Sequence, residues 1–388
     1  MTQLQFSLNM DILKDSVMNS NMEAVVKSTI VLVLNEYMEK ERDAYLKAEA
    51  YERTETRKDY RNGYYDRNYT MSIGKIELRV PRTRSGEFSP SVFEKYKRVD
   101  QAFTLAMLEM VVNGVSTRKV TNIVKELCGE EVSKSFVSSL TAKLDPIVRE
   151  WTDRPLNTMY CPYVFVDAMY IKVREHQRVV SKAVYIATAI NEENKREVLG
   201  LKVDHQESLE AWQAFLESLV ARGLSSPKLI ISDAHKGLKK AIAKTFVGTS
   251  WQRCTVHFKR NILAKLPKKR IKEILPDIKR IFHTVKPGDA RRFKEEFILK
   301  YQADNKLEAA SKILDEGFED AIQYLSQPEK YHPFIHSTNH LERLNEELRR
   351  RETVIRIFPN TQSAFRLLGA HLMEYAETKQ QQRAIFKH

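Results

Sequence analysis

Two short apolar runs of the sequence each lead into an aspartate. Val164–Val166 precedes Asp167, and Leu229–Ser232 precedes Asp233. Runs of β-branched and other apolar residues are typical of buried strands, and α/β folds collect their chemistry where such strands end. If the two strands are neighbours, the carboxylates converge, and a cation is needed to offset their repulsion. Hard oxygen ligands of this kind suit Mg²⁺ or Mn²⁺.

A third carboxylate, Glu342, lies far downstream. The intervals are 66 residues from Asp167 to Asp233 and 109 residues from Asp233 to Glu342. Two metal ions held by three such acids form the usual machinery for in-line displacement at a phosphodiester. Taken singly, each acid has a simpler explanation: Asp167 as a turn residue, Asp233 as a helix cap and Glu342 as a surface residue of a helix. Glu346 and Glu347 are rivals for the third position.

The elements that must position these acids follow a recognisable order. Strands are predicted at 164–173, 179–190, 196–203, 228–232 and 250–254, with 175–178 as a hairpin and helices at 208–222, 234–246 and from 256. Three meandering strands followed by two strand–helix units are the order of the ribonuclease H-like fold, with right-handed parallel crossovers. In that order the first and fourth strands are adjacent, so Asp167 and Asp233 fall side by side.

The remaining segments complete an α/β domain organisation. We expect a ribonuclease H-like catalytic domain from residues 160–256 and 336–388, interrupted by an all-helical, basic insertion at 257–335. After the insertion, a helix at 338–351 carries Glu342, and a final amphipathic helix follows at 361–380.

The N-terminal region, 1–150, is predicted to be mainly helical and to bind DNA. A small β-element with alternating tyrosines and arginines is expected near 60–85. Two short helices near 115–143 resemble a helix-turn-helix, the first capped by Ser116 or Thr117. Because many helical hairpins look like this, plain packing of the two helices is an equal alternative.

The charge balance favours an anionic partner. The 388 residues carry a formal net charge of +13, and residues 251–300 alone hold 15 Lys/Arg against 5 Asp/Glu. Nucleic acid is the first expectation, with a solvated basic face as the alternative. Basic residues near the predicted elements are candidate phosphate contacts, which would fix register without reading sequence: Arg118, Lys134, Lys259, Arg260, Lys265, Lys268, Lys269, Arg270, Arg349, Arg350 and Arg351.

Composition also bounds the cellular setting. Three widely spaced cysteines argue against a disulfide framework and favour a reducing cytoplasm. We expect no membrane segment, because no run of about 18 apolar residues occurs, and the first residues lack the features of a secretory signal. The length leaves room for two or three domains.

The pair Cys254 and His257 has zinc-like spacing. Zinc sites in proteins need about four ligands, and no second Cys/His pair of suitable spacing follows. The pair comes directly after the fifth predicted strand. We therefore expect it to support the carboxylates or to touch DNA phosphate, with a purely structural role favoured.

Jointly, five segments resemble the Mutator-type DDE transposases of bacterial insertion sequences. They occur in the family's order and span the catalytic half of the chain: Val166–Val173, Glu197–Gly200, Ser232–Gly237, Arg253–Asn261 and Thr338–Asn345. The resemblance implies that Asp167, Asp233 and Glu342 are the catalytic triad. It further implies two Mg²⁺ (or Mn²⁺) ions per site, with Cys254, His257 and Asn339 as supporting residues.

The reaction implied is metal-dependent cleavage and strand transfer at the inverted-repeat ends of a mobile element. The partners would be double-stranded DNA and further copies of the chain, in a homodimer or larger synaptic complex. Two alternatives stay open: a metal-dependent nuclease or junction resolvase of the same fold, and a non-catalytic DNA-binding repressor. Strand joining separates the first alternative from a transposase, and binding without metal dependence marks the second.

Overall fold

The computed structural model describes residues 22–52, 54, 56–71, 74–93, 101–128, 132–378 and 384–386. The chain divides into two compact units, Met1–Thr141 and Ala142–His388. The division falls before the predicted boundary at residue 150 because helix α6 (Leu144–Thr152) packs on the second unit. Asp145 of α6 accepts two hydrogen bonds from Arg366, at 2.5 and 3.0 Å.

In the first unit, a long helix packs on a β-hairpin. Helix α2 (Met22–Leu46) covers the strands β1 (Arg61–Met71) and β2 (Gly74–Thr83), which pair antiparallel. Burial alternates along β2, so that one face of the hairpin is buried and the other meets solvent. The buried face packs with α2 around Met38, Ile76, Leu78, Val80 and Phe93. The β-element expected near 60–85 is therefore present.

The first unit continues with three helices. They are α3 (Gln101–Val112), α4 (Thr117–Cys128) and α5 (Lys134–Thr141), packed around Met107, Val120, Val124, Val137 and Leu140. The expected cap is present, because Ser116 Oγ accepts a hydrogen bond from the amide of Lys119 at 3.3 Å. Ser133 caps α5 in the same way, accepting from Phe136 N at 3.0 Å.

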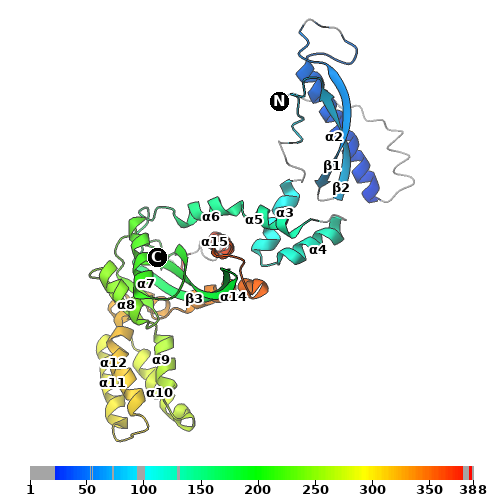
Figure 1. The fold of residues 1–388 in the computed structure, drawn as a ribbon. Helices are drawn as coiled ribbons and strands as arrows, with labels where there is room; N and C mark the ends of the chain where they lie inside the picture. The colour runs from blue at the N-terminus through cyan, green and yellow to red at the C-terminus, as the bar shows by residue number, and fades with distance from the viewer. Residues whose placement is uncertain are drawn as a thin grey trace. The chain divides into compact units, whose positions relative to one another are not determined.

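The second unit is built on a five-stranded mixed sheet (Figure 1). Its strands are β3 (Tyr163–Glu175), β4 (Arg178–Ile190), β5 (Arg196–Asp204), β6 (Leu229–Ser232) and β7 (Ser250–Arg253), in the order β5-β4-β3-β6-β7. The first three pair antiparallel, and β6 and β7 are parallel to β3. The predicted adjacency of the first and fourth strands is confirmed. His176 and Gln177 both have positive φ, as a tight hairpin turn requires.

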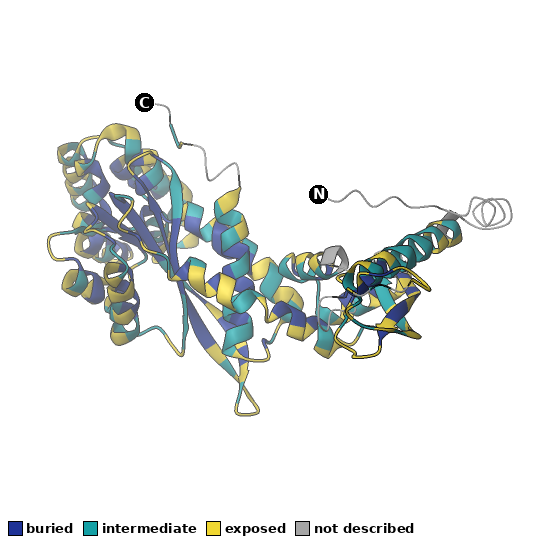
Figure 2. Cartoon of the chain, turned by 90° about the horizontal axis from the view of Figure 1, so that it is seen from above, coloured by how far each residue is buried: buried dark blue, intermediate teal, exposed yellow. Residues whose placement is uncertain are grey.

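The two faces of this sheet are covered by different helices. Val164 and Val166 of β3 face a core that includes α7 (Leu209–Ala221) and α8 (Lys236–Thr245), with Trp212 fully buried between them and the sheet. Side chains alternate along a strand, so Phe165 and Asp167 lie on the opposite face. Figure 2 shows the buried strands between helices whose outer faces are exposed.

The helical insertion follows β7. It comprises α9 (Thr255–Leu263), η1 (Lys268–Arg270), α10 (Ile271–Phe282), α11 (Pro287–Tyr301) and α12 (Glu308–Ala321), then the short helices η2 (Gln323–Ser326), η3 (Glu329–Tyr331) and α13 (His332–Ile335). Its two ends meet: Thr255 N donates to His336 O at 3.0 Å, and Thr255 Oγ1 lies 2.8 Å from His336 Nδ1. The buried Gln252 side chain joins β7 to Ala321 O and Tyr324 N, both at 2.8 Å.

Two helices complete the unit. Helix α14 (Asn339–Ile355) packs on β3 and runs past its predicted end at residue 351. Helix α15 (Thr361–Glu377) packs on α6 and β5, and its predicted end at 380 lies outside the described residues. Among the helices that the structure describes, none combines the length and apolar character needed to cross a bilayer.

Candidate active site

The pairing of β3 with β6 sets the heights of the two aspartates. Tyr163 lies opposite Leu229 and Phe165 opposite Ile231 in a parallel register. Asp167 and Asp233 each follow two residues later, so they lie at the same level of the sheet. Asp233 stands where β6 ends, whereas Asp167 lies within β3, which continues beside β4 to Glu175. The expectation of a carboxylate at a strand's exit therefore holds for Asp233 only.

A histidine of the insertion connects Asp233 to Glu342. His257, in the first turn of α9, forms a hydrogen bond through Nδ1 with Asp233 Oδ1. Its Nε2 lies 3.4 Å from Glu342 Oε1, in the first turn of α14. Thr338 Oγ1 donates to the same Glu342 oxygen at 3.3 Å. The imidazole therefore bridges two acids that are 109 residues apart in sequence.

Asp167 is joined to α14 by an amide. Asn345 Nδ2 donates to Asp167 Oδ2 at 2.7 Å, and Ala168 N donates to Asp167 Oδ1 at 2.9 Å. Burial, reinforced by the negative charge of Asp233, raises the pKa of Asp167 to about 7. Asn345 Oδ1 is buried without a hydrogen-bond partner among the described residues. The closely spaced oxygens of Asp167, Asp233 and Asn345 fit a divalent cation. A bound cation would relieve the repulsion between the two carboxylates and favour the charged form of Asp167.

The Cys254 and His257 pair carries unusual charge states. His257 forms hydrogen bonds with Asp233 and with Cys254, and these raise the pKa of His257 to about 10. The imidazole ring is therefore cationic at neutral pH. Burial of Cys254 opposes ionisation, yet hydrogen bonds from His257 and Thr338 hold the pKa of this thiol below its ordinary value. Thr338 N and Oγ1 lie 3.5 and 3.3 Å from Cys254 Sγ.

The structure brings a different asparagine to the acids from the one expected. Asn339 is exposed at the start of α14 and lines a separate depression of about 570 Å³ with Arg343 and Glu346. Asn345 instead contacts Asp167, because it lies three residues after Glu342 and so shares its helix face. That spacing is the sequence signal that identifies Asn345, and sequence reasoning missed it.

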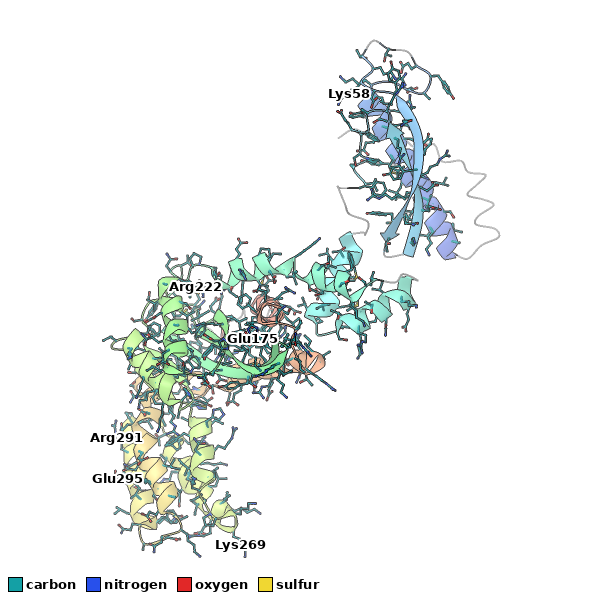
Figure 3. The ribbon with its side chains drawn as sticks, in the orientation of Figure 1. Lys58, Glu175, Arg222, Lys269, Arg291 and Glu295 are labelled. Carbon is teal, nitrogen blue, oxygen red and sulfur yellow. The ribbon has the colours of Figure 1, made fainter. Side chains whose placement is uncertain are left out.

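The predicted phosphate contacts lie in several places. Lys265, Lys268 and Lys269 are exposed at the far end of the insertion, where Figure 3 labels Lys269. Arg260, Arg349 and Arg350 are exposed elsewhere on the second unit, and Arg118 and Lys134 are exposed at the starts of α4 and α5. Burial lowers the pKa of Lys259.

Three of the predicted phosphate contacts are held by acids of the chain itself. The exposed Arg350 lies 2.8 Å from Glu347. Arg270 is paired with Asp304 and, at 3.0 Å, with Glu273. Arg351 lies 3.6 Å from Glu347, with its side chain only 16% exposed. These intramolecular pairs make Arg270 and Arg351 poorer phosphate ligands than the lysines at the end of the insertion.

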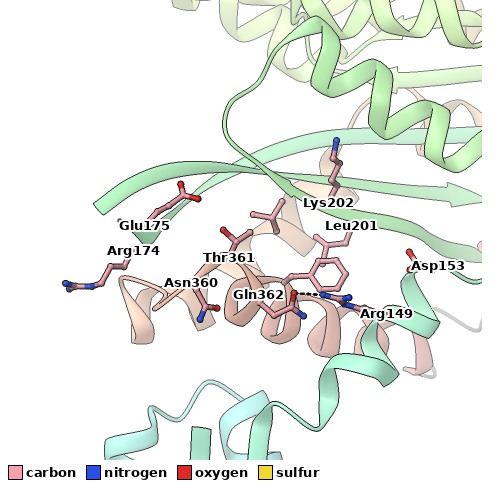
Figure 4. Close-up of a pocket in the computed structure, with 11 residues that line it drawn as sticks. Arg149, Asp153, Arg174, Glu175, Leu201, Lys202, Asn360, Thr361 and Gln362 are labelled. Atoms are coloured by element: carbon pink, nitrogen blue, oxygen red, sulfur yellow. Dashed lines mark hydrogen bonds between the residues drawn. The ribbon is translucent and has the colours of Figure 1, made fainter. Parts of the chain in front are cut away.

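A further cavity of the second unit contains none of the three acids. It has a volume of about 650 Å³ and lies between α6, the sheet and the start of α15 (Figure 4). Arg149 donates to Gln362 Oε1 across it at 2.8 Å. The cavity is lined by the cations Arg174 and Lys202 and by the acids Asp153 and Glu175. The charge of this lining therefore favours neither an anionic nor a cationic ligand.

Comparison with known proteins shows the family to which this chain belongs. The family model described as "Transposase, Mutator family" matches residues 1–382. The chain belongs to the Mutator family of transposases, as the sequence motifs predicted.

Transposases of several insertion sequences are similar to this chain over most of its length. The chain is 50% identical over 374 residues, 96% of each chain, to the transposase for insertion sequence element IS256 in transposon Tn4001 of Staphylococcus aureus. It is 39% identical over 352 residues to the transposase for ISRM5 of Rhizobium meliloti, covering 91% of this chain and 88% of that one. For the IS1081 transposase of Mycobacterium tuberculosis, identity is 36% over 350 residues, covering 89% and 83%.

Proposed function

We propose that this protein cleaves and joins DNA strands at the inverted-repeat ends of an insertion sequence. In this proposal Asp167, Asp233 and Glu342 hold two Mg²⁺ or Mn²⁺ ions. The observation that carries it is the β3–β6 register, which brings the partly buried Asp167 and Asp233 to the same level of the sheet, while α14 contributes Glu342 through His257 and Asn345 through Asp167. The strand order β5-β4-β3-β6-β7, interrupted before α14 by the helical insertion, supports a ribonuclease H-like catalytic domain.

The bound ions would activate the attacking oxygen, from water for nicking or a 3′-hydroxyl for strand transfer, and would stabilise the leaving oxygen. The chain's own residues prepare the ligands. Asp167 gives up its proton to become a ligand, and Asn345 fixes the direction of its Oδ2. Thr338 orients Glu342 in the same way. His257 contacts both Asp233 and Glu342, and these contacts would have to open for the two acids to hold the ions.

The decisive experiment is a coupled cleavage and joining assay on DNA that carries the element's ends. Wild-type protein with Mg²⁺ is expected to release 3′-hydroxyl ends and join them to target DNA. Asp233→Asn, which keeps the side chain's size, should bind the same DNA and leave it intact. Cleavage without joining would instead identify a nuclease or resolvase. Binding with no cleavage under any metal would identify a repressor and contradict the proposal.

Binding of double-stranded DNA is assigned to both units. We propose that the first unit recognises the element's ends, through the α4–α5 pair with the exposed Arg118 and Lys134. The basic end of the insertion would hold the phosphate backbone without reading sequence. Joining two ends requires at least two copies of the chain on paired ends, so a homodimer or larger complex in the cytoplasm is part of the proposal.

The insertion's role can be measured through salt dependence. Changing both Lys268 and Lys269 to glutamine should lower the slope of log affinity against log salt by about 1.8, because each phosphate contact contributes about 0.9. A matched control changes Arg291 and Lys294 to glutamine, removing equal charge from residues already paired with Glu319 and Asp315 at 2.9 and 2.7 Å. Equal slopes for the two double variants would exclude a backbone contact at Lys268 and Lys269.

A further inference from the structure

A second set of possible metal ligands shares one residue with the acid triad. Asp233, Cys254 and His257 each offer a ligand atom, and these three atoms lie within 4.8 Å of one another. This donor set differs in kind from three carboxylates. Sulfur and imidazole select thiophilic transition ions such as Zn²⁺ or Co²⁺, whereas Mg²⁺ prefers oxygen.

We propose that Asp233, Cys254 and His257 form a binding site for Zn²⁺ or a similar thiophilic ion, whose occupation inhibits strand cleavage by withdrawing Asp233 from the Mg²⁺ site. The binding site stands on its own geometry, and only the inhibition depends on the function proposed above.

The surroundings of Cys254 suit a thiolate ligand. Its side chain is fully buried, and the backbone N–H of Thr338 points at Sγ from 3.5 Å. The Thr338 hydroxyl, which donates to Glu342, lies 3.3 Å from Sγ and can turn its single proton to a thiolate there. Hydrogen bonds of this kind orient and stabilise metal-bound sulfur. Cys254 is also the N-cap residue of α9, where the helix dipole favours a negative charge. The buried Cys161 lies in a contrasting setting, since burial raises its pKa to about 12 and keeps it a neutral thiol.

The fold supplies the ligands that the Cys-x-x-His spacing alone lacks. Asp233 arrives from the end of β6, 21 residues before Cys254 in sequence. Glu342 Oε1 lies next to the cluster, 3.4 Å from His257 Nε2, and water can complete a four-ligand shell. Binding requires the thiol and the imidazolium to release their protons to solvent and the His257–Asp233 hydrogen bond to open.

Cobalt absorption tests the site directly on the full chain. Adding Co²⁺ to metal-free protein is expected to produce a thiolate-to-cobalt charge-transfer band, which Zn²⁺ then abolishes by displacement. Cys254→Ser should remove the band, and the matched variant Cys161→Ser should retain it. Thr338→Val, which keeps every ligand, should weaken Zn²⁺ binding by about 10–100-fold. Absence of the band in wild type, or its persistence in folded Cys254→Ser, would overturn the proposal.

A second arm separates this inference from the proposed function. With Mg²⁺ present, Zn²⁺ should inhibit DNA cleavage by wild type and by Cys161→Ser to the same degree. Cys254→Ser, compared with its own rate without Zn²⁺, should resist inhibition. Zn²⁺ that binds through Cys254 without slowing cleavage overturns the inhibition. A protein that shows the cobalt band but never cleaves DNA retains the thiophilic site and refutes the transposase chemistry instead.

Discussion

Changing Asp167 to asparagine is expected to abolish Mg²⁺-dependent cleavage and, at the same time, to stabilise the metal-free protein. The loss of cleavage, about 10³-fold or more, follows from removing a ligand charge from the proposed two-metal site. The gain in stability follows from burial: Asp167 is held beside Asp233, and its pKa is raised to about 7 from 3.8. The new amide keeps a hydrogen bond, because Asn345 can rotate its unpartnered Oδ1 toward it.

The pH dependence of this gain follows from the sign of the shift. Between pH 3.8 and about 7 the folded protein retains a proton that the unfolded chain has lost, so Asp167 destabilises the fold increasingly as pH rises through this window. At pH 8 without metal, Asp167→Asn should raise the free energy of unfolding by about 2–4 kcal/mol. The difference should shrink toward zero near pH 4. Denaturant unfolding with a chelator present measures both values, and a variant less stable than wild type at pH 8 would contradict the assignment.

Changing Glu342 to glutamine is expected to reduce cleavage by about 10³-fold or more, while the same change at Glu346 alters it by less than about twofold. The two residues lie on one helix, but only Glu342 faces His257, and Glu346 is exposed in the depression beside Arg343. Single-turnover cleavage of the element's ends gives both rates. If only Glu346→Gln lost cleavage, the third acid would be Glu346, one helical turn further on, and the proposed triad would be wrong.

The arrangement of the sheet was predictable because each strand is marked by a run of residues within its own segment of the sequence. The run Leu229–Ile231 is apolar throughout and buried in a four-residue strand, and β3 to β5 alternate or run apolar over their whole lengths. Once their order is fixed, adjacency of β3 and β6 follows from the usual right-handed connections. The turn at His176 and Gln177 was placed correctly as well, since it interrupts two such runs.

The contacts that complete the site depend on distant parts of the chain, and sequence reasoning did not find them. The bridge from Asp233 through His257 to Glu342 depends on how the insertion returns to the sheet, which no local pattern records. The pairing of Arg270 with Asp304 across the insertion likewise removes a residue that charge alone made a candidate for DNA. Asn345 was missed because its position three residues after Glu342 was not converted into a shared helix face.

The bond between Thr255 and His336 closes the insertion at its base, so about eighty residues leave and re-enter the second unit at nearly the same point. The entropy of closing such a loop grows only slowly with its length. The outer helices of the insertion, α10 and α11, pack mainly on each other, whereas α12 packs on α9 and β7. Lengthening, trimming or replacing these outer helices is therefore expected to leave Glu342 in position opposite Asp233. The outer helices form a module that can diverge, or be exchanged between relatives, independently of the chemistry beneath it.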